Sequence, residues 1–280
     1  MATQRGGGDG GDGRSEIERH LELLWRVAER PRRGPRPGLT VEEIVSAAVG
    51  VADADGLGAV SMQRVAAELG YTTMSLYRYV QSKEQLVELM ADAAVGPPPD
   101  IGEAAGWRDR VELLSRALVE CNRRRPWLLR VEIVGPPSGP MQLAWFEAYL
   151  EALAECGLAG YERVAVTLFI NGAVRELARI AVQIEQARRA GGVSDESAGA
   201  AYAAALRRFA VPERFPNVAA LVAEGVFDPE PADGGPVAAP DGADWGLVDE
   251  IGADITFGLR RLLDGVESYA REREHQAGTA

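Results

Sequence analysis

Apolar residues recur at intervals of three and four along most of the chain, which is the period of an amphipathic α-helix. The pattern predicts helices over residues 15–29, 40–55, 61–69, 73–79, 82–95, 107–122, 126–133, 141–156, 161–189, 195–209 and 245–271. No convincing run of alternating apolar and polar residues marks a half-buried strand. The sequence therefore predicts an all-α fold.

Capping signals indicate where several of these helices begin. A Ser or Thr is followed three residues later by Glu or Gln at Ser15 and Glu18, at Thr40 and Glu43, and at Ser82 and Gln85. In such a capping box each side chain bonds to a free backbone N–H of the other residue. At the opposite ends, Gly56 and Gly157 are well placed to stop helices.

Stretches rich in Gly, Pro and charged residues separate the helical parts. Residues 1–13 are Gly/Asp-rich and are expected to be disordered, and the Pro- and Gly-rich stretch 228–244 is expected to be a mobile loop. The predicted domains are 1–38, a tail with a short helix and a basic arm; 39–95, a small helical domain; and 96–280, a larger helical domain.

The stretch 61–79 combines a helix, a turn containing glycine and a short second helix. This is the arrangement of a helix-turn-helix unit, whose second helix enters the major groove of DNA. Leu76 and Val80 are the inward positions of that second helix. Its outward positions carry hydrogen-bonding groups or an apolar surface, at Thr72, Thr73, Met74, Ser75, Arg78 and Tyr79. The alternative is an ordinary pair of helices with a polar outer face.

The runs 61–70, 73–80 and 82–86 resemble the DNA-binding domain of the TetR family, and the resemblance covers about residues 39–95. It implies that Tyr77 and Lys83 contact DNA phosphates on either side of the recognition helix. It also implies that Thr73, Met74, Ser75, Arg78 and Tyr79 face the groove, while Gln63 reaches a base or a phosphate. More loosely, residues 125–158 resemble the C-terminal domain of the tetracycline-repressor type.

The resemblance implies a cytoplasmic transcriptional repressor that binds a palindromic double-stranded operator as a homodimer. Helices 161–189 and 245–271 would form the dimer interface, and a small, largely apolar effector would release the DNA. In the last helix, apolar residues suited to that interface are Trp245, Val248, Ile255, Leu259, Leu262, Leu263 and Val266, with Gly252 and Gly258 allowing close approach. The rival hypothesis is a helical small-molecule-binding protein or an enzyme without DNA-binding activity.

The net charge of −12 does not favour a nucleic-acid ligand, but the charge is unevenly distributed. Residues 1–90 hold 11 basic and 13 acidic residues, whereas residues 91–280 hold 19 basic and 29 acidic ones. The Arg- and Pro-rich segment 30–36 lies directly before the predicted DNA-binding domain. It is interpreted as a flexible arm that contacts DNA, with a solvated linker as the alternative.

Two features of the predicted domain 96–280 suggest a ligand site. The helix over 141–156 is apolar around most of its circumference, which is typical of a buried helix or a cavity wall. In the next helix Thr167, Asn171 and Arg175 form a polar row among apolar residues. The predicted ligand contacts are Trp127, Met141, Trp145, Tyr149, Phe169, Asn171 and Arg175. Plain core packing is the alternative for the apolar set, and a hydrogen-bonded core or interface row for the polar one.

Other chemistry finds little support in the sequence. There is no Walker motif, no GxGxxG turn after a strand and no GxSxG elbow, so an enzyme is not expected. The two histidines and two cysteines have no metal-ligand spacing, and we expect neither a metal nor a cofactor. No apolar stretch reaches the roughly 20 residues of a membrane span, so no membrane partner is expected.

Overall fold

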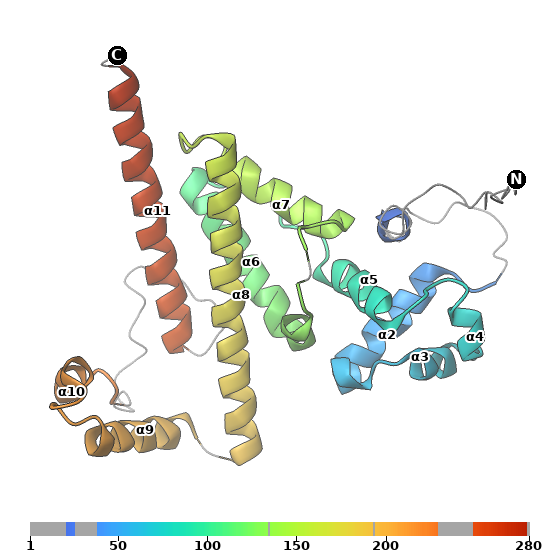
Figure 1. The fold of residues 1–280 in the computed structure, drawn as a ribbon, viewed down its shortest axis with the longest axis horizontal. Coiled ribbons are helices and arrows are strands. Elements are labelled where there is room, and N and C mark those ends of the chain that lie inside the picture. The colour runs from blue at the N-terminus through green and yellow to red at the C-terminus, as the bar shows by residue number, and fades with distance from the viewer. Residues whose placement is uncertain (1–20, 26–37, 134, 193, 229–248, 279–280) are drawn as a thin grey trace, which may run out of the picture. The chain divides into compact units, whose positions relative to one another are not determined.

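The computed structural model describes residues 21–25, 38–133, 135–192, 194–228 and 249–278 (Figure 1). These residues form helices and contain no strand, which confirms the all-α prediction. Residues 21–25 are helical. The helices that follow are α2 (Val41–Asp55), η1 (Leu57–Ala59), α3 (Met62–Leu69), α4 (Thr73–Leu76), α5 (Lys83–Val95), α6 (Trp107–Arg124), η2 (Pro126–Arg130), α7 (Pro140–Ala152), α8 (Gly160–Gly191), α9 (Asp195–Phe209), α10 (Pro216–Ala223) and α11 (Asp249–Gly278).

The described residues form two compact units, and neither is a single stretch of chain. The first contains the residues up to Asp100 together with Trp127–Tyr149. The second contains Ile101–Pro126 and the chain from Leu150 onward. The N-terminal part of α7 therefore packs with the helices near the N-terminus, although α6 lies between them in the sequence.

In the first unit, α2 is the central helix and packs against both α3 and α5. It begins at the predicted capping box, where the Glu43 N–H donates to Thr40 Oγ1 at 3.2 Å and the Thr40 N–H donates to Glu43 Oε2 at 3.0 Å. Its inward face buries Ile44, Val45 and Ala48. These contacts give α3 and α4 a fixed support.

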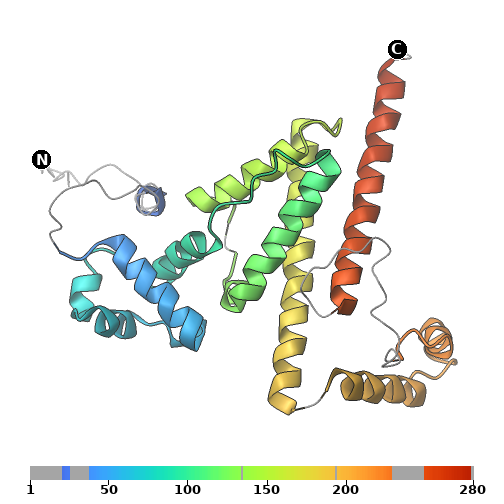
Figure 2. The same cartoon turned by 180° about the vertical axis from the view of Figure 1, so that it is seen from behind.

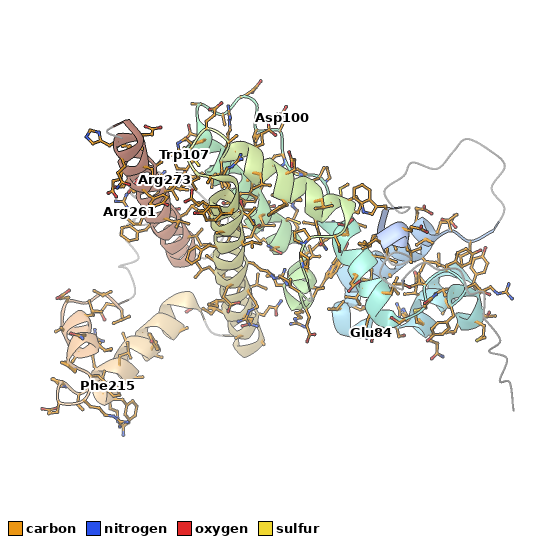
Figure 3. The ribbon with its side chains drawn as sticks, turned by 45° about the horizontal axis from the view of Figure 1, so that its top comes forward. Glu84, Asp100, Trp107, Phe215, Arg261 and Arg273 are labelled. Carbon is orange, nitrogen blue, oxygen red and sulfur yellow. The ribbon has the colours of Figure 1, made fainter. Side chains whose placement is uncertain are left out.

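In the second unit, α8 packs against α6 and α11, and Figure 2 shows the three helices from behind. The inner face of α11 buries Ile255, Leu259, Leu263 and Val266. Ion pairs flank this apolar contact: Arg108 to Glu267 (2.9 Å) and to Asp264, Arg260 to Glu112 (3.2 Å), and Arg273 to Glu162 (2.6 Å). Arg273 and Arg261 mark α11 in Figure 3.

The structure differs from the sequence predictions at several helix boundaries. The stretch predicted as helix 126–133 is a short 3₁₀ helix, η2, and the recognition helix ends at Leu76 rather than at residue 79. Helix α10 was not predicted, although Pro216 occupies a first-turn position that suits proline. The predicted tail, arm and loop over residues 1–13, 30–36 and 229–244 lie outside the described residues. Within the described chain, no helix is both long enough and apolar enough to cross a membrane.

Candidate DNA-binding surface and ligand contacts

Helix α3, the turn after it and α4 form the predicted helix-turn-helix. Ser61 caps α3 by accepting a hydrogen bond from the Arg64 N–H at 3.1 Å. Gly70 ends α3 with φ +73° and ψ +24°, a left-handed conformation in which a side chain would be strained. The chain therefore turns sharply here, and α4 packs against α3.

Helix α4 has only four residues, so its position depends on capping and burial. Thr72 caps it by accepting a hydrogen bond from the Ser75 N–H at 3.3 Å, and the two hydroxyl oxygens lie 2.9 Å apart. Leu76 and Val80 are fully buried, as predicted. The Thr72 cap and the two buried side chains hold the outward face of α4 in one orientation.

The outward face displays the side chains predicted to contact DNA. Met74 is 75% exposed, and Tyr77, Arg78 and Tyr79 are also exposed. Thr73 and Ser75 are half-buried, whereas Gln63 on α3 is exposed. The hydroxyls of Thr72 and Ser75 already bond to each other, so these two side chains have a structural role in addition to any contact with DNA.

The start of α5 adds a cationic group beside this face. Ser82 caps α5 through the Gln85 N–H at 3.1 Å, while the Gln85 side chain accepts from the Gln81 N–H at 2.7 Å. The predicted capping box at Ser82 is therefore only half formed. Lys83 is exposed in the first turn, next to Glu84, which is labelled in Figure 3. Free N–H groups and an ammonium at a helix N-terminus favour a phosphate.

Comparison with known proteins identifies this arrangement. The family described as bacterial regulatory proteins, tetR family, matches residues 44–90, and the tetracyclin repressor-like C-terminal domain matches residues 99–229. The chain is 37% identical over 278 residues to the HTH-type transcriptional repressor DrrR1 of Streptomyces coeruleorubidus, which covers 98% of this chain and 94% of that protein. The chain belongs to the tetR family of bacterial regulatory proteins. The rival hypothesis of a helical small-molecule-binding protein or an enzyme without DNA-binding activity is not favoured.

Solved structures of the tetR family share the fold. Apo ActR from Streptomyces coelicolor matches with a TM-score of 0.62 and 24% identity, over 85% of this chain and 99% of that one. ActR in complex with actinorhodin matches with a TM-score of 0.60 and 25% identity, over 84% of this chain and 99% of that one.

Four of the predicted ligand contacts lie in the first unit of this tetR-family chain. Trp127, Trp145 and Tyr149 are buried, and Met141 is half-buried. The Trp127 indole N–H donates to Asp53 Oδ1 at 2.6 Å, and the Trp145 indole N–H donates to the Gly96 carbonyl at 2.9 Å. Both tryptophans thus serve the packing of this unit, and only their rings remain available to a ligand.

The other three lie on α8 in the second unit, but not on one face. Asn171 and Arg175 are half-buried, and the Asn171 side-chain amide donates to the Thr167 carbonyl at 2.9 Å. Burial lowers the pKa of the Arg175 guanidinium, and the charge of Glu176 offsets part of this effect. Phe169 is 65% exposed on the outer side of α8, because two residues advance a helix by about 200°. Phe169 and Asn171 thus lie on different sides of α8, and the assignment of Phe169 to the ligand stays a prediction.

The polar row also contains a group that was left out of the predicted contacts. Thr167 is fully buried, and its hydroxyl has no hydrogen-bond partner in the described structure. The neighbouring helix α6 contributes buried Ser115 and Asn122. The spacing of Thr167, four residues before Asn171, was the only signal that the sequence offered for it.

We predict that the Thr72→Ala variant weakens DNA binding by loosening α4. Losing an N-cap costs about 1 kcal/mol, equivalent to roughly a fivefold loss of affinity. Thr72→Ser keeps the hydroxyl and should bind like the natural chain. Fluorescence anisotropy with a labelled duplex from upstream of the coding sequence measures affinity, and thermal unfolding measures stability. If Thr72→Ala lost affinity for the duplex but unfolded at the same temperature as the natural chain, the capping role of Thr72 would be contradicted.

Proposed function

We propose that this protein is a cytoplasmic, sequence-specific repressor that binds a palindromic double-stranded operator as a homodimer and releases it when a small, largely apolar effector binds. Residues 39–95 are the proposed DNA-binding domain. One observation carries the proposal: exposed polar and aromatic side chains on α4 and the turn after it, anchored by buried Leu76 and Val80, lie within the region that matches the tetR family.

The proposed contacts divide into two kinds. Tyr77 and Lys83 are assigned to phosphates, which position the protein but carry no sequence information. Thr73, Met74 and Arg78 are assigned to base edges, together with Thr72, Ser75 and Tyr79, and Gln63 is assigned to a base or a phosphate. Guanidinium and hydroxyl groups can hydrogen-bond to bases in the major groove, and the Met74 side chain offers apolar contact to a thymine methyl.

We predict that Lys83→Ala weakens binding to every duplex alike, because a phosphate contact is lost. The slope of log affinity against log salt should fall by about one unit. Arg78→Ala should instead change which bases are preferred. Gel shifts with the upstream duplex and with scrambled duplexes test both effects. The matched control is Arg208→Ala, which removes an exposed cation from α9. Unchanged affinity of Lys83→Ala at moderate salt would contradict the assignment.

The homodimer is supported by an apolar outer face in the second unit. On α8 this face exposes Tyr161, Leu168 and Phe169, and on α11 it exposes Phe257 and Tyr269. Apolar surfaces of this kind mark interaction sites in soluble proteins. The predicted interface residues Ile255, Leu259, Leu263 and Val266 are buried within their own chain, so they are not free to contact a second copy. The proposed interface uses the opposite side of α11, which includes exposed Gly258.

We predict that Phe169→Glu dissociates the dimer, because a carboxylate would have to be buried between two copies. Sedimentation should give twice 30.0 kDa for the natural chain and about 30.0 kDa for the variant. Phe209→Glu is the matched control, since Phe209 on α9 is also 65% exposed. A natural chain that sediments only as a monomer at micromolar concentration would overturn the proposal.

The effector proposal rests on the ligand-bound relative and on the polar row of α8. ActR has been solved in complex with actinorhodin and with (S)-DNPA. Among the described residues the Thr167 hydroxyl has no hydrogen-bond partner, and the Asn171 and Arg175 side chains follow it at intervals of four residues along α8. These groups could orient an oxygen of the effector. Met141 and the rings of Trp127, Trp145 and Tyr149 are proposed as separate apolar contacts in the first unit.

We predict that Asn171→Ala raises the effector concentration needed for half-release of the duplex by about tenfold, which corresponds to the loss of one hydrogen bond between the effector and this half-buried side chain. Met141→Ala tests the apolar contacts in the same way. The titration uses actinorhodin and a panel of small apolar metabolites, with Phe209→Ala as the control. Linkage requires that the duplex weaken effector binding by the same factor. If all variants released the duplex at the same effector concentration, the effector would have to bind at another site.

A further inference from the structure

The N-terminal end of α7 is capped by a side chain from another helix. Pro140 has no N–H, so the first free donors of α7 are the N–H groups of Met141 and Gln142. Both donate to the Asp92 carboxylate of α5: Gln142 N–H to Oδ1 at 2.9 Å, and Met141 N–H to Oδ1 at 3.1 Å and Oδ2 at 3.3 Å. Gly139, directly before α7, has no side chain that could do this.

The site of this contact is shaped for a carboxylate. Asp92 is only 4% exposed, and burial raises the pKa of its carboxyl while the two backbone donors oppose that rise. A Cβ atom on Gly139 would lie 2.1 Å from Asp92 Oδ1, so any larger residue there would displace the carboxylate. The missing side chain at Gly139 therefore leaves room for the carboxylate that accepts from the two N–H groups.

A second bond joins the same two helices one turn further along α7. The Trp145 indole donates to the carbonyl of Gly96, which directly follows α5. A third contact, from Trp127 to Asp53, ties η2 to the last turns of α2. Segment 127–149 is therefore attached to the helix-turn-helix unit at three points and belongs to the same compact unit.

The Asp92 contact favours two discrete arrangements of α5 and α7 over a gradual movement of one helix along the other. A buried carboxylate is costly unless it is hydrogen-bonded, and bonds from two N–H groups to a charged acceptor are strong and directional. If α5 and α7 shift apart, both bonds are lost and the carboxylate must reach water or take up a proton. An element with two such arrangements can carry coupling between sites.

We propose that Asp92 is a positioning residue that couples α7 to the DNA-binding surface, so that segment 127–149 and the recognition helix respond as one body to DNA and to the effector. This inference rests on the proposed function, because it names how the effector contacts Met141 and Trp145 would act on Lys83 at the other end of α5. A phosphate held by Lys83 restrains α5, and reciprocity requires that it also stabilise the cap on α7.

The test is hydrogen–deuterium exchange at single-amide resolution, on the full chain with and without the upstream duplex. Gly139→Ala displaces the carboxylate without changing the charge, and Asp92→Asn keeps one acceptor oxygen. Gly135→Ala is the matched control, because a Cβ there meets nothing within 4 Å in the same connection. Circular dichroism checks that each variant is folded, and anisotropy reports duplex binding in the same samples.

In the natural chain and in Gly135→Ala, bound duplex should slow exchange at Met141 and Gln142. In Gly139→Ala both amides should exchange about tenfold faster in the free chain, as expected for loss of a bond to a charged acceptor, and bound duplex should no longer slow them. Asp92→Asn should accelerate exchange less, because its one remaining acceptor oxygen keeps part of the bonding.

If bound duplex left exchange at Met141 and Gln142 unchanged in the natural chain, the coupling between α7 and the DNA-binding surface would be overturned. This would hold even if the Asp92 cap itself were present. Equal exchange in Gly139→Ala and Gly135→Ala would overturn the cap. A natural chain that fails to bind the duplex in the anisotropy measurement would overturn the proposed function and the coupling together, and this result is distinct from the other two.

Discussion

A helix of one turn has almost no stability of its own in water, and α4 therefore depends on its surroundings for its shape. Burial of Leu76 supplies the main restraint, since a fully buried leucine side chain contributes about 2 kcal/mol. Gly70 sets the direction of the chain before α4, and Thr72 satisfies one of its free N–H groups. The proposed base contacts from Thr72 to Tyr79 are all positioned through this small anchored turn, whereas Gln63 is carried by α3.

Much of the fold could be predicted because its signals are local. The capping residues at Thr40 and Ser61 and the period of apolar residues give the starts of α2 and α3, and Leu76 and Val80 are buried as their spacing predicts. The outward face of α4 follows directly from that spacing. Segments without such signals were predicted less well, as η2 shows: its short 3₁₀ geometry is set by buried Trp127 and its neighbours rather than by a local pattern.

The surroundings of the predicted ligand contacts were harder to predict from the sequence, for two physical reasons. Helix α8 is apolar on several sides, so its sequence alone does not distinguish the side facing α6 and α11 from the outer side that carries Phe169. The cap of α7 comes from Asp92, 49 residues before Met141, and no local spacing marks such a partner. Long-range contacts of this kind also take up the indole N–H groups of Trp127 and Trp145, which the sequence would have left free for a ligand.

The division of the chain into two compact units determines which truncated fragments keep their internal contacts. The backbone passes from one compact unit to the other after Asp100, returns after Pro126 and leaves again after Tyr149. A fragment cut at residue 100 would include the whole helix-turn-helix, yet the buried Asp92 carboxylate and the Gly96 carbonyl would lose the donors that α7 supplies. The segment that resembles an independent DNA-binding module in sequence is thus only part of a compact unit. Fusion or domain-exchange designs that preserve this unit need to carry residues 127–149 along with it.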